Sequence, residues 1–210
     1  IIMINSNLLL DSNHFPVMLD EVIKISSPEK GGLFIDCTFG GGGYSKKLLN
    51  FSKTQVIAFD RDEFILKIAD NLKKQYPNRF SFFQKKFSEV DTVVKKRSVD
   101  CIIFDLGLSS IQLNNLKRGF SFKSKDSLDM SMGLTNKSAE EVVNNYSEQK
   151  IKLILKILGE EQDASRISKN IIKARSVKKI TKVNQLVEII EKSKKKDYSN
   201  KINPSTKTFQ

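Results

Sequence analysis

Four short apolar runs alternate with amphipathic stretches over the first half of the chain, and this alternation restricts the fold more than any other feature. The runs cover residues 33–37, 56–59, 80–83 and 101–106. Parallel strands that are covered on both faces have this continuous apolar composition. Between the runs, residues 65–72 place apolar side chains on one face of a helix, and residues 44–51 form a shorter helical stretch. The order of strand, helix, strand and helix predicts a doubly wound α/β sheet.

The second half of the chain has no convincing strand and reads as helical. Ser138 and Glu141 form a capping-box pattern, and apolar stripes with helical spacing follow in residues 151–158, 164–174 and 183–190. The stretch 107–136, rich in Ser, Gly, Lys and Asp, is too long for an ordinary connection. We therefore predict a functional segment followed by a small helical domain.

The charge is concentrated in this second half. The chain carries 36 Lys and Arg against 24 Asp and Glu, a net charge of +12. Residues 1–110 hold 15 basic and 13 acidic side chains, whereas residues 111–210 hold 21 and 11. The second half is therefore the candidate for contact with a polyanion such as a nucleic acid. A generally lysine-rich composition is the alternative, because 30 of the 36 basic residues are Lys.

Several protein classes are excluded by composition. The two cysteines, Cys37 and Cys101, lie inside apolar runs, where free thiols behave as small buried hydrophobes. No window approaches the roughly 18 apolar residues of a membrane span, and residues 1–10 lack the basic start and cleavage site of a leader. We therefore expect a cytoplasmic protein. The single histidine, His14, cannot build a Cys/His cluster, so we predict no metal site.

A glycine run after the first predicted strand indicates a cofactor site. Gly40–Gly43 opens a helix at the position where α/β sheets bind ligands. Ser45 replaces the third glycine of a dinucleotide fingerprint, and Asp36 precedes the loop. The Asp36 carboxylate can pair with the ammonium of a methionine moiety, while Gly40 and its neighbours let a backbone approach. These features favour S-adenosylmethionine, although glycine runs also occur in plain turns.

The ends of the other predicted strands carry residues suited to the rest of that ligand. Asp60 follows the glycines by about twenty residues, where it can bind ribose hydroxyls or simply start a helix. Phe87 can wall the adenine or pack in the core. The fourth strand ends in Asp105, and Ser109 lies in the turn that follows, beside the expected methyl group. We predict that both are catalytic, because Asp105 can accept hydrogen bonds from a poorly nucleophilic exocyclic amine.

A series of motifs in one order makes the sequence recognisable. It comprises His14–Val17, Asp36–Ser45, Asp60–Asp62, Asp105–Gln112, Arg118–Phe122, Leu128–Met130, Gly159–Glu161 and Pro204–Gln210. The series closely resembles the bacterial 16S rRNA cytosine-N4 methyltransferase family, and the resemblance covers essentially the whole chain. The most specific pair of motifs is Asp-Leu-Gly-Leu-Ser-Ser with Arg-Gly-Phe-Ser-Phe.

The resemblance implies an S-adenosylmethionine-dependent enzyme that methylates N4 of a cytidine in the decoding centre of 16S rRNA, in the small ribosomal subunit. It implies a Rossmann-like core over residues 1–124, an inserted all-helical domain over 125–202, and a return to the core at 203–210. By motif, the cofactor contacts are Gly42, Gly43, Tyr44, Asp60, Phe87, Asp105 and Gln112.

Four residues depart from the family pattern. Tyr44 and Asn203 stand where the family usually has His, and Ser131 and Lys207 stand where it has Arg. At Ser131 the change removes a natural phosphate or base contact. The family continues well beyond Gln210, so we expect a C-terminally truncated sequence whose incomplete sheet exposes apolar surface.

Residues of the second half are candidates for RNA contact. Arg118, Phe120 and Phe122 can hold RNA by phosphate contact and stacking, or can close the core beneath their loop. Lys194, Lys195 and Lys196 lie in a basic cluster that can bind rRNA phosphates or keep a helix end solvated. His14, the single histidine, is more often a structural residue than a catalyst in such a context, and the family resemblance makes it a candidate for lining the site.

Two rival functions stay open. One is an amino-methyltransferase acting on another nucleic acid, but DNA-modifying enzymes of this kind resemble one another in an Asp/Asn/Ser-Pro-Pro-Tyr/Phe tetrad, and this chain has Asp105-Leu106-Gly107-Leu108. The other is a ribosome-binding scaffold without catalytic activity, which the departures at Ser131 and Asn203 allow.

Overall fold

The computed structural model describes residues 16–134, 137–194 and 202–210. These residues divide between Ser110 and Ile111 into two compact units, here the sheet unit and the helical unit. The division lies earlier than the boundary expected at residue 124. It falls there because the segment 116–131 packs with the helices, where the amide of Leu128 donates to Thr181 O. No helix in the described part of the chain combines the length and apolar character needed to cross a membrane.

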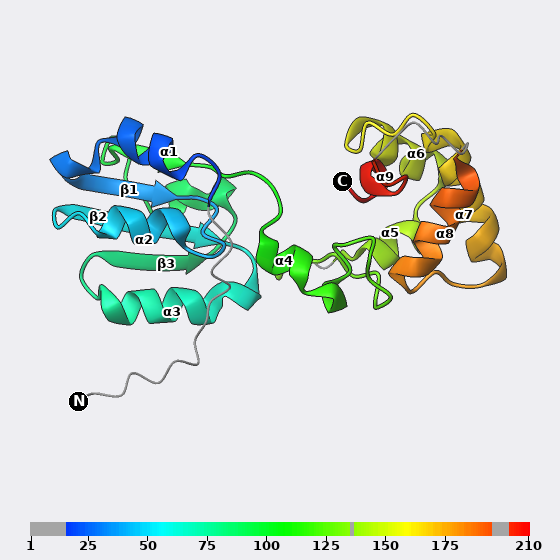
Figure 1. Cartoon of the computed structure of the whole chain (residues 1–210), viewed down its shortest axis with the longest axis horizontal. Helices are drawn as coiled ribbons and strands as arrows, with labels where there is room; N and C mark the ends of the chain where they lie inside the picture. The colour runs from blue at the N-terminus through cyan, green and yellow to red at the C-terminus, as the bar shows by residue number, and fades with distance from the viewer. Residues whose placement is uncertain (1–15, 135–136, 195–201) are drawn as a thin grey trace. The chain divides into compact units, whose positions relative to one another are not determined.

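The sheet unit is built on four parallel strands (Figure 1). They are β1 (Gly32–Asp36), β2 (Thr54–Asp60), β3 (Phe80–Gln84) and β4 (Cys101–Ile103), in the order β3-β2-β1-β4. All pairs are parallel, which confirms the predicted α/β architecture. The connections place the carboxyl ends of the strands at one edge of the sheet, where the candidate functional residues follow.

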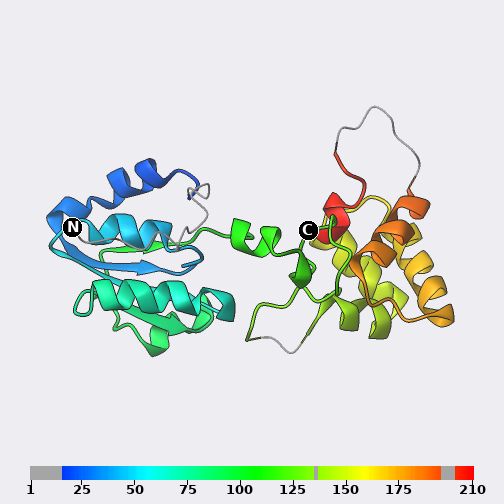
Figure 2. The ribbon, with the colours of Figure 1, turned by 60° about the horizontal axis from the view of Figure 1, so that its bottom comes forward.

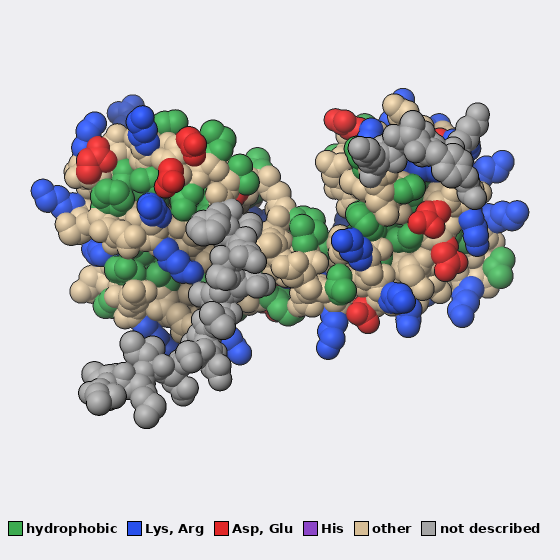
Figure 3. Space-filling view, in the orientation of Figure 1, with side chains coloured by type: hydrophobic (Ala, Val, Ile, Leu, Met, Phe, Trp, Pro, Cys, Tyr) green, Lys and Arg blue, Asp and Glu red, His purple; other side chains and the backbone are tan. Residues whose placement is uncertain are grey.

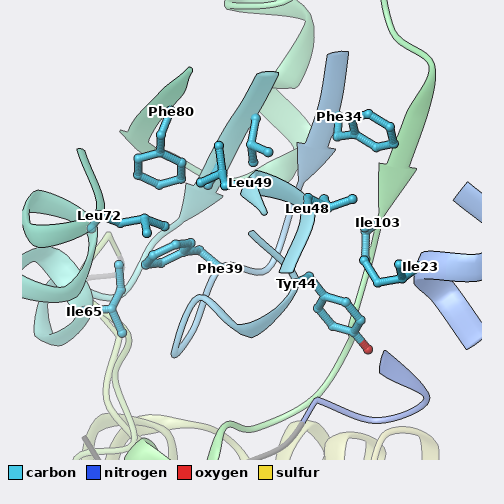
Figure 4. Close-up of a cluster of buried hydrophobic side chains, with 13 residues drawn as sticks. Ile23, Phe34, Phe39, Tyr44, Leu48, Leu49, Ile65, Leu72, Phe80 and Ile103 are labelled. Carbon is cyan, nitrogen blue, oxygen red and sulfur yellow. The ribbon is translucent and has the colours of Figure 1, made fainter. Parts of the chain in front are cut away.

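Each face of the sheet is covered by different elements. The helices of this unit are α1 (Leu19–Ser26), η1 (Pro28–Lys30), α2 (Gly43–Leu49), η2 (Glu63–Ile65), α3 (Leu66–Gln75) and η3 (Phe87–Thr92). Because successive strand residues point to opposite faces, Phe34 belongs to the buried cluster that includes Leu48 of α2 and Leu72 of α3 (Figure 4). Ile35 belongs to a separate buried cluster on the other face. The two faces together bury most of the first three apolar runs found in the sequence.

The fourth apolar run differs from its prediction. We expected a buried strand over residues 101–106, but β4 ends at Ile103. Beyond the strand Phe104 is 50% exposed and Leu106 71% exposed. Of the described strands, β4 pairs with β1 alone, so it forms an edge of the sheet. An apolar run therefore predicted the strand but not its position at the edge.

The second unit is helical, as predicted (Figure 2). Its elements are α4 (Ser110–Asn114), which crosses the division, η4 (Leu116–Arg118), α5 (Ala139–Asn145), α6 (Glu148–Ile157), α7 (Ala164–Val177), α8 (Val183–Ser193) and α9 (Thr206–Phe209). Ser138 caps α5 by accepting a hydrogen bond from the amide of Glu141 at 3.1 Å. The apolar stripes of α6, α7 and α8 meet in one core.

The C-terminal segment packs with these helices. Phe209 lies against the helical core and contacts the ring of Phe122 at 6.3 Å between centroids. The Thr208 hydroxyl donates to the carboxylate of Glu161 at 3.0 Å. In this structure residues 203–210 therefore lie with the helical unit, and the expectation that they start the segment returning to the core stays a prediction. The Phe122 contact favours the core-closing interpretation of this side chain over stacking on RNA.

Candidate functional site

The glycine loop between β1 and α2 adopts a left-handed backbone conformation that favours glycine. Gly42 caps α2 with a left-handed backbone, φ +74°, and a Cβ there would lie 2.8 Å from the ring of Phe39. Gly40 is also left-handed, φ +48°, but a Cβ there would meet only ordinary contacts, the nearest being Ser109 Cβ at 3.8 Å. The loop is therefore tightly packed at Gly42 and more open at Gly40, where Ser109 lies beside it.

We predict that alanine is tolerated at Gly40 better than at Gly42. Gly42→Ala combines left-handed strain with a clash against Phe39, so it should lower the free energy of unfolding by about 2 kcal/mol. Gly40→Ala carries the strain alone and should cost about 1 kcal/mol. Urea denaturation of the two variants measures the difference. Equal losses would contradict the packing described for Gly42.

Asp60, at the end of β2, holds the glycine loop. Its carboxylate accepts hydrogen bonds from the amide of Gly40 at 2.8 Å and from the amide of Asp62 at 2.9 Å. Burial raises the pKa of the Asp60 carboxyl, and these backbone hydrogen bonds partly offset that rise. The structure thus joins two predicted site residues that are twenty positions apart.

Asp105 lies at the same edge of the sheet, just beyond β4. Its amide donates to Thr38 Oγ1 at 2.7 Å, which ties it to the loop after β1. Its side chain is partly exposed, and its negative charge helps burial to raise the pKa of Tyr44. With Gly40 beside Ser109, the structure brings both predicted catalytic residues to the glycine loop. This is an arrangement suited to placing a hydrogen-bond acceptor next to a bound ligand.

Asp36 is placed differently from the other predicted carboxylates. Its side chain is fully buried, and it accepts hydrogen bonds from Ser45 Oγ at 2.7 Å and from the amide of Thr38 at 3.3 Å. Burial raises the pKa of Asp36 from 3.8 to about 6, against the lowering effect of these hydrogen bonds. In this structure the Asp36 carboxylate therefore stabilises the glycine loop through hydrogen bonds to Thr38 and Ser45. Its contact with a cofactor ammonium stays a prediction.

This raised pKa predicts a pH-dependent stability. Between pH 3.8 and about 6 the unfolded chain has released the Asp36 proton while the folded chain retains it. Because the unfolded state then binds fewer protons, stability falls as pH rises through this window, by about 3 kcal/mol. The Asp36→Asn variant has no titrating carboxyl group at this position. The unfolding free energy of wild type minus that of the variant should therefore fall from pH 4 to 7, and a constant difference would contradict the assignment.

Aromatic residues near the site have contrasting environments. The Tyr44 side chain is buried in the core, and its hydroxyl donates to Val17 O, so any cofactor contact by Tyr44 comes from its backbone (Figure 4). Gly43 is equally covered, because a Cβ there would clash with Pro16. Phe87 is 46% exposed, and its ring meets Phe104 edge to face at 5.6 Å. Sequence reasoning missed Phe104, since nothing distinguishes it within its apolar run.

The remaining predicted residues lie in the helical unit or outside the described residues. Gln112 is buried in α4. Arg118 is 5% exposed, donates to Ser131 O at 2.8 Å and lies over the ring of Phe120. The Lys194 ammonium pairs with Glu161 at 2.6 Å. These contacts give Arg118 and Lys194 intramolecular roles, and RNA contact by either stays a prediction.

Lys195, Lys196 and His14 fall outside the described residues. Among the residues that are described, no group of three or more His, Cys, Asp or Glu side chains is arranged to hold a metal ion.

A parallel sheet with a glycine loop after β1, an acidic residue at the end of β2 and another just beyond β4 is consistent with the Rossmann-like methyltransferase class. A family model described as the MraW methylase family matches residues 11–210. The chain belongs to this family.

Similar proteins are named ribosomal RNA small subunit methyltransferase H. The protein of Rickettsia akari (strain Hartford) is 42% identical over 197 residues, which cover 94% of this chain and 64% of the relative. That of Orientia tsutsugamushi (strain Ikeda) is 42% identical over 205 residues, covering 96% and 66%. That of Neorickettsia sennetsu is 40% identical over 198 residues, covering 94% and 67%. The chain thus spans about two thirds of the length of these relatives.

Proposed function

We propose that this protein transfers a methyl group from S-adenosylmethionine to N4 of a cytidine in 16S rRNA of the small ribosomal subunit. The observation that carries the proposal is the meeting of the glycine loop, Asp60, Asp105 and Ser109 at one edge of the sheet. The printed names of the relatives supply the substrate class, small-subunit rRNA. The choice of N4 follows from the family resemblance of the motifs around Asp105.

The residues at the sheet edge fit this cofactor. The loop at Gly40 leaves room for a close approach, since a Cβ there would lie 3.8 Å from its nearest neighbour. The Asp60 carboxylate, which now accepts two amide hydrogen bonds, would bind ribose hydroxyls. The half-exposed ring of Phe87 offers an apolar face for adenine. The donor set is thus one of backbone amides, carboxylates and an aromatic ring.

Asp105 performs the central step of the proposed reaction. When bound, S-adenosylmethionine supplies a methyl group whose bond to sulfur breaks as its bond to the cytidine nitrogen forms. The Asp105 carboxylate accepts a hydrogen bond from the exocyclic amine and takes up the proton that the nitrogen loses. This contact also stabilises the positive charge that develops on that nitrogen. Ser109, beside Gly40, orients the amine.

The helical unit supplies the surface for RNA. Exposed cations follow the outer faces of two adjacent helices, Lys152 and Lys156 on α6 with Lys169 and Lys173 on α7. Figure 3 shows Lys and Arg side chains around the visible face of this unit. Such side chains bind phosphates without reading sequence, so binding should weaken steeply with salt.

A labelling experiment tests the proposal. The 210-residue chain is incubated with methyl-labelled S-adenosylmethionine and small subunits that lack the modification, and the digested rRNA is analysed by mass spectrometry. Label in N4-methylcytidine is the expected result. Equilibrium dialysis with the cofactor is run in parallel. Binding without label would overturn the enzymatic proposal in favour of a scaffold, and label in a different nucleoside would overturn the assigned target.

A further inference from the structure

We propose that Thr38 is a positioning residue that holds Asp105 in its reactive place through one side-chain hydrogen bond. This inference rests on the proposed function, in which Asp105 accepts a hydrogen bond from the nucleophilic amine. Thr38 itself is two residues beyond β1 and is not needed to explain cofactor binding. Its hydroxyl oxygen accepts a hydrogen bond from the amide of Asp105 at 2.7 Å.

The hydrogen bond between Thr38 and Asp105 lies just beyond the last paired residues of β1 and β4. The ladder between β1 and β4 ends where Asp36 pairs with Ile103, and the amide of Cys37 donates to Ile103 O at 2.9 Å. After Ile103 the chain leaves the sheet, and Phe104 and Leu106 on either side of Asp105 are exposed. The Thr38 hydroxyl thus adds one more hydrogen bond between the ends of β1 and β4. This bond is made at Asp105, whose carboxylate is the proposed proton acceptor.

Thr38 is itself held firmly enough to act as a fixed point. Its amide donates to the buried Asp36 carboxylate at 3.3 Å, and the next amide, that of Phe39, donates to Phe59 O at 3.0 Å. A β-branched side chain also has restricted χ1 freedom. Backbone and side chain together therefore fix the hydroxyl oxygen that receives the Asp105 amide.

This geometry predicts a specific pattern of kinetic effects. Displacement of a reacting group by about 1 Å can cost a hundredfold in rate. Thr38→Val keeps the shape of the side chain and removes the acceptor, so we expect kcat to fall about tenfold, with a smaller change in cofactor Kd. Thr38→Ser keeps the hydroxyl and should stay within about threefold of wild type.

A double-mutant cycle separates positioning from general destabilisation. If Thr38 acts through the Asp105 carboxylate, then Thr38→Val should lower single-turnover rates in the wild-type background and leave them unchanged in Asp105→Ala. A purely structural residue would lower the rate equally in both backgrounds, and that result would overturn the inference. Wild-type kcat in Thr38→Val would also overturn it.

A measurement without catalysis distinguishes failure of this inference from failure of the proposed function. Hydrogen exchange at the Asp105 amide should be about tenfold faster in Thr38→Val than in wild type, and close to wild type in Thr38→Ser. If the wild-type chain transfers no methyl group, the proposed function fails while the exchange result still tests the Thr38 contact. Unchanged exchange in Thr38→Val would overturn the contact itself.

Discussion

Replacement of Asp105 by alanine should lower the rate of methyl transfer by about a thousandfold, the effect of removing a positioned proton acceptor. The exocyclic amine of cytosine is a poor nucleophile, so loss of the carboxylate removes both the acceptor of its proton and the charge that stabilises the transition state. The variant should remain folded, because the hydrogen bond to Thr38 comes from the Asp105 amide and not from its side chain.

The measurement is single-turnover transfer of labelled methyl to small subunits, with cofactor binding and thermal unfolding determined on the same samples. Asp105→Asn preserves the size of the side chain and should be nearly as slow. Asp70→Asn is the matched control, because this carboxyl is exposed on α3, away from the strand ends. Near wild-type turnover in Asp105→Ala would contradict the role assigned to this residue.

Replacement of Glu161 by alanine should lower the free energy of unfolding of the helical unit by about 4 kcal/mol. The Glu161 side chain is 2% exposed and pairs with Lys194, which is 16% exposed, at 2.6 Å. It also accepts hydrogen bonds from Thr208 Oγ1 at 3.0 Å and from the amide of Asp163 at 3.2 Å. Its removal leaves an ammonium and two further donors without their partner in a water-poor environment.

Denaturant unfolding of the full chain, followed by a probe in the helical unit, measures this loss. Glu161→Gln keeps one acceptor oxygen but loses the second acceptor and the charge, so it should fall between wild type and the alanine variant. Glu188→Ala is the control, because its pair with Lys192 is exposed at 3.9 Å and should contribute less than about 0.5 kcal/mol. Equal effects at Glu161 and Glu188 would show that burial of the ion pair has no energetic consequence.

The part of the site that depends on the order of motifs along the chain could be predicted from the sequence. The glycine run after β1 and the carboxyl groups that follow β2 and β4 were identified from strand ends, because parallel strands bring those ends to one edge. The contact between Asp60 and the Gly40 amide has the chain separation predicted for a ligand-binding acid. The Thr38 contact with Asp105 was not predicted, since a hydroxyl two residues after a strand has no distinctive pattern.

Burial of charged residues was the least predictable property. Asp36 and Asp105 both occur at the end of a strand predicted to be buried, yet the structure buries Asp36 against Ser45 and leaves Asp105 partly exposed. Arg118 and Lys194 were candidates for phosphate contact in sequence, and in the structure they bond to Ser131 and Glu161. A charged side chain is buried only when distant parts of the chain supply its partner, and sequence spacing does not reveal that partner.

The sequence by itself determined the four strands and the helical second half, because these follow from the short-range periodicity of apolar residues. It also determined the glycine loop and the family, because these follow from motifs and their order along the chain. Only the tertiary structure decided that β4 is an edge strand, that the C-terminal segment packs on the helical core, and that Thr38 meets Asp105. These are contacts between residues far apart in the chain. They depend on how the elements pack and not on the residues that form each element.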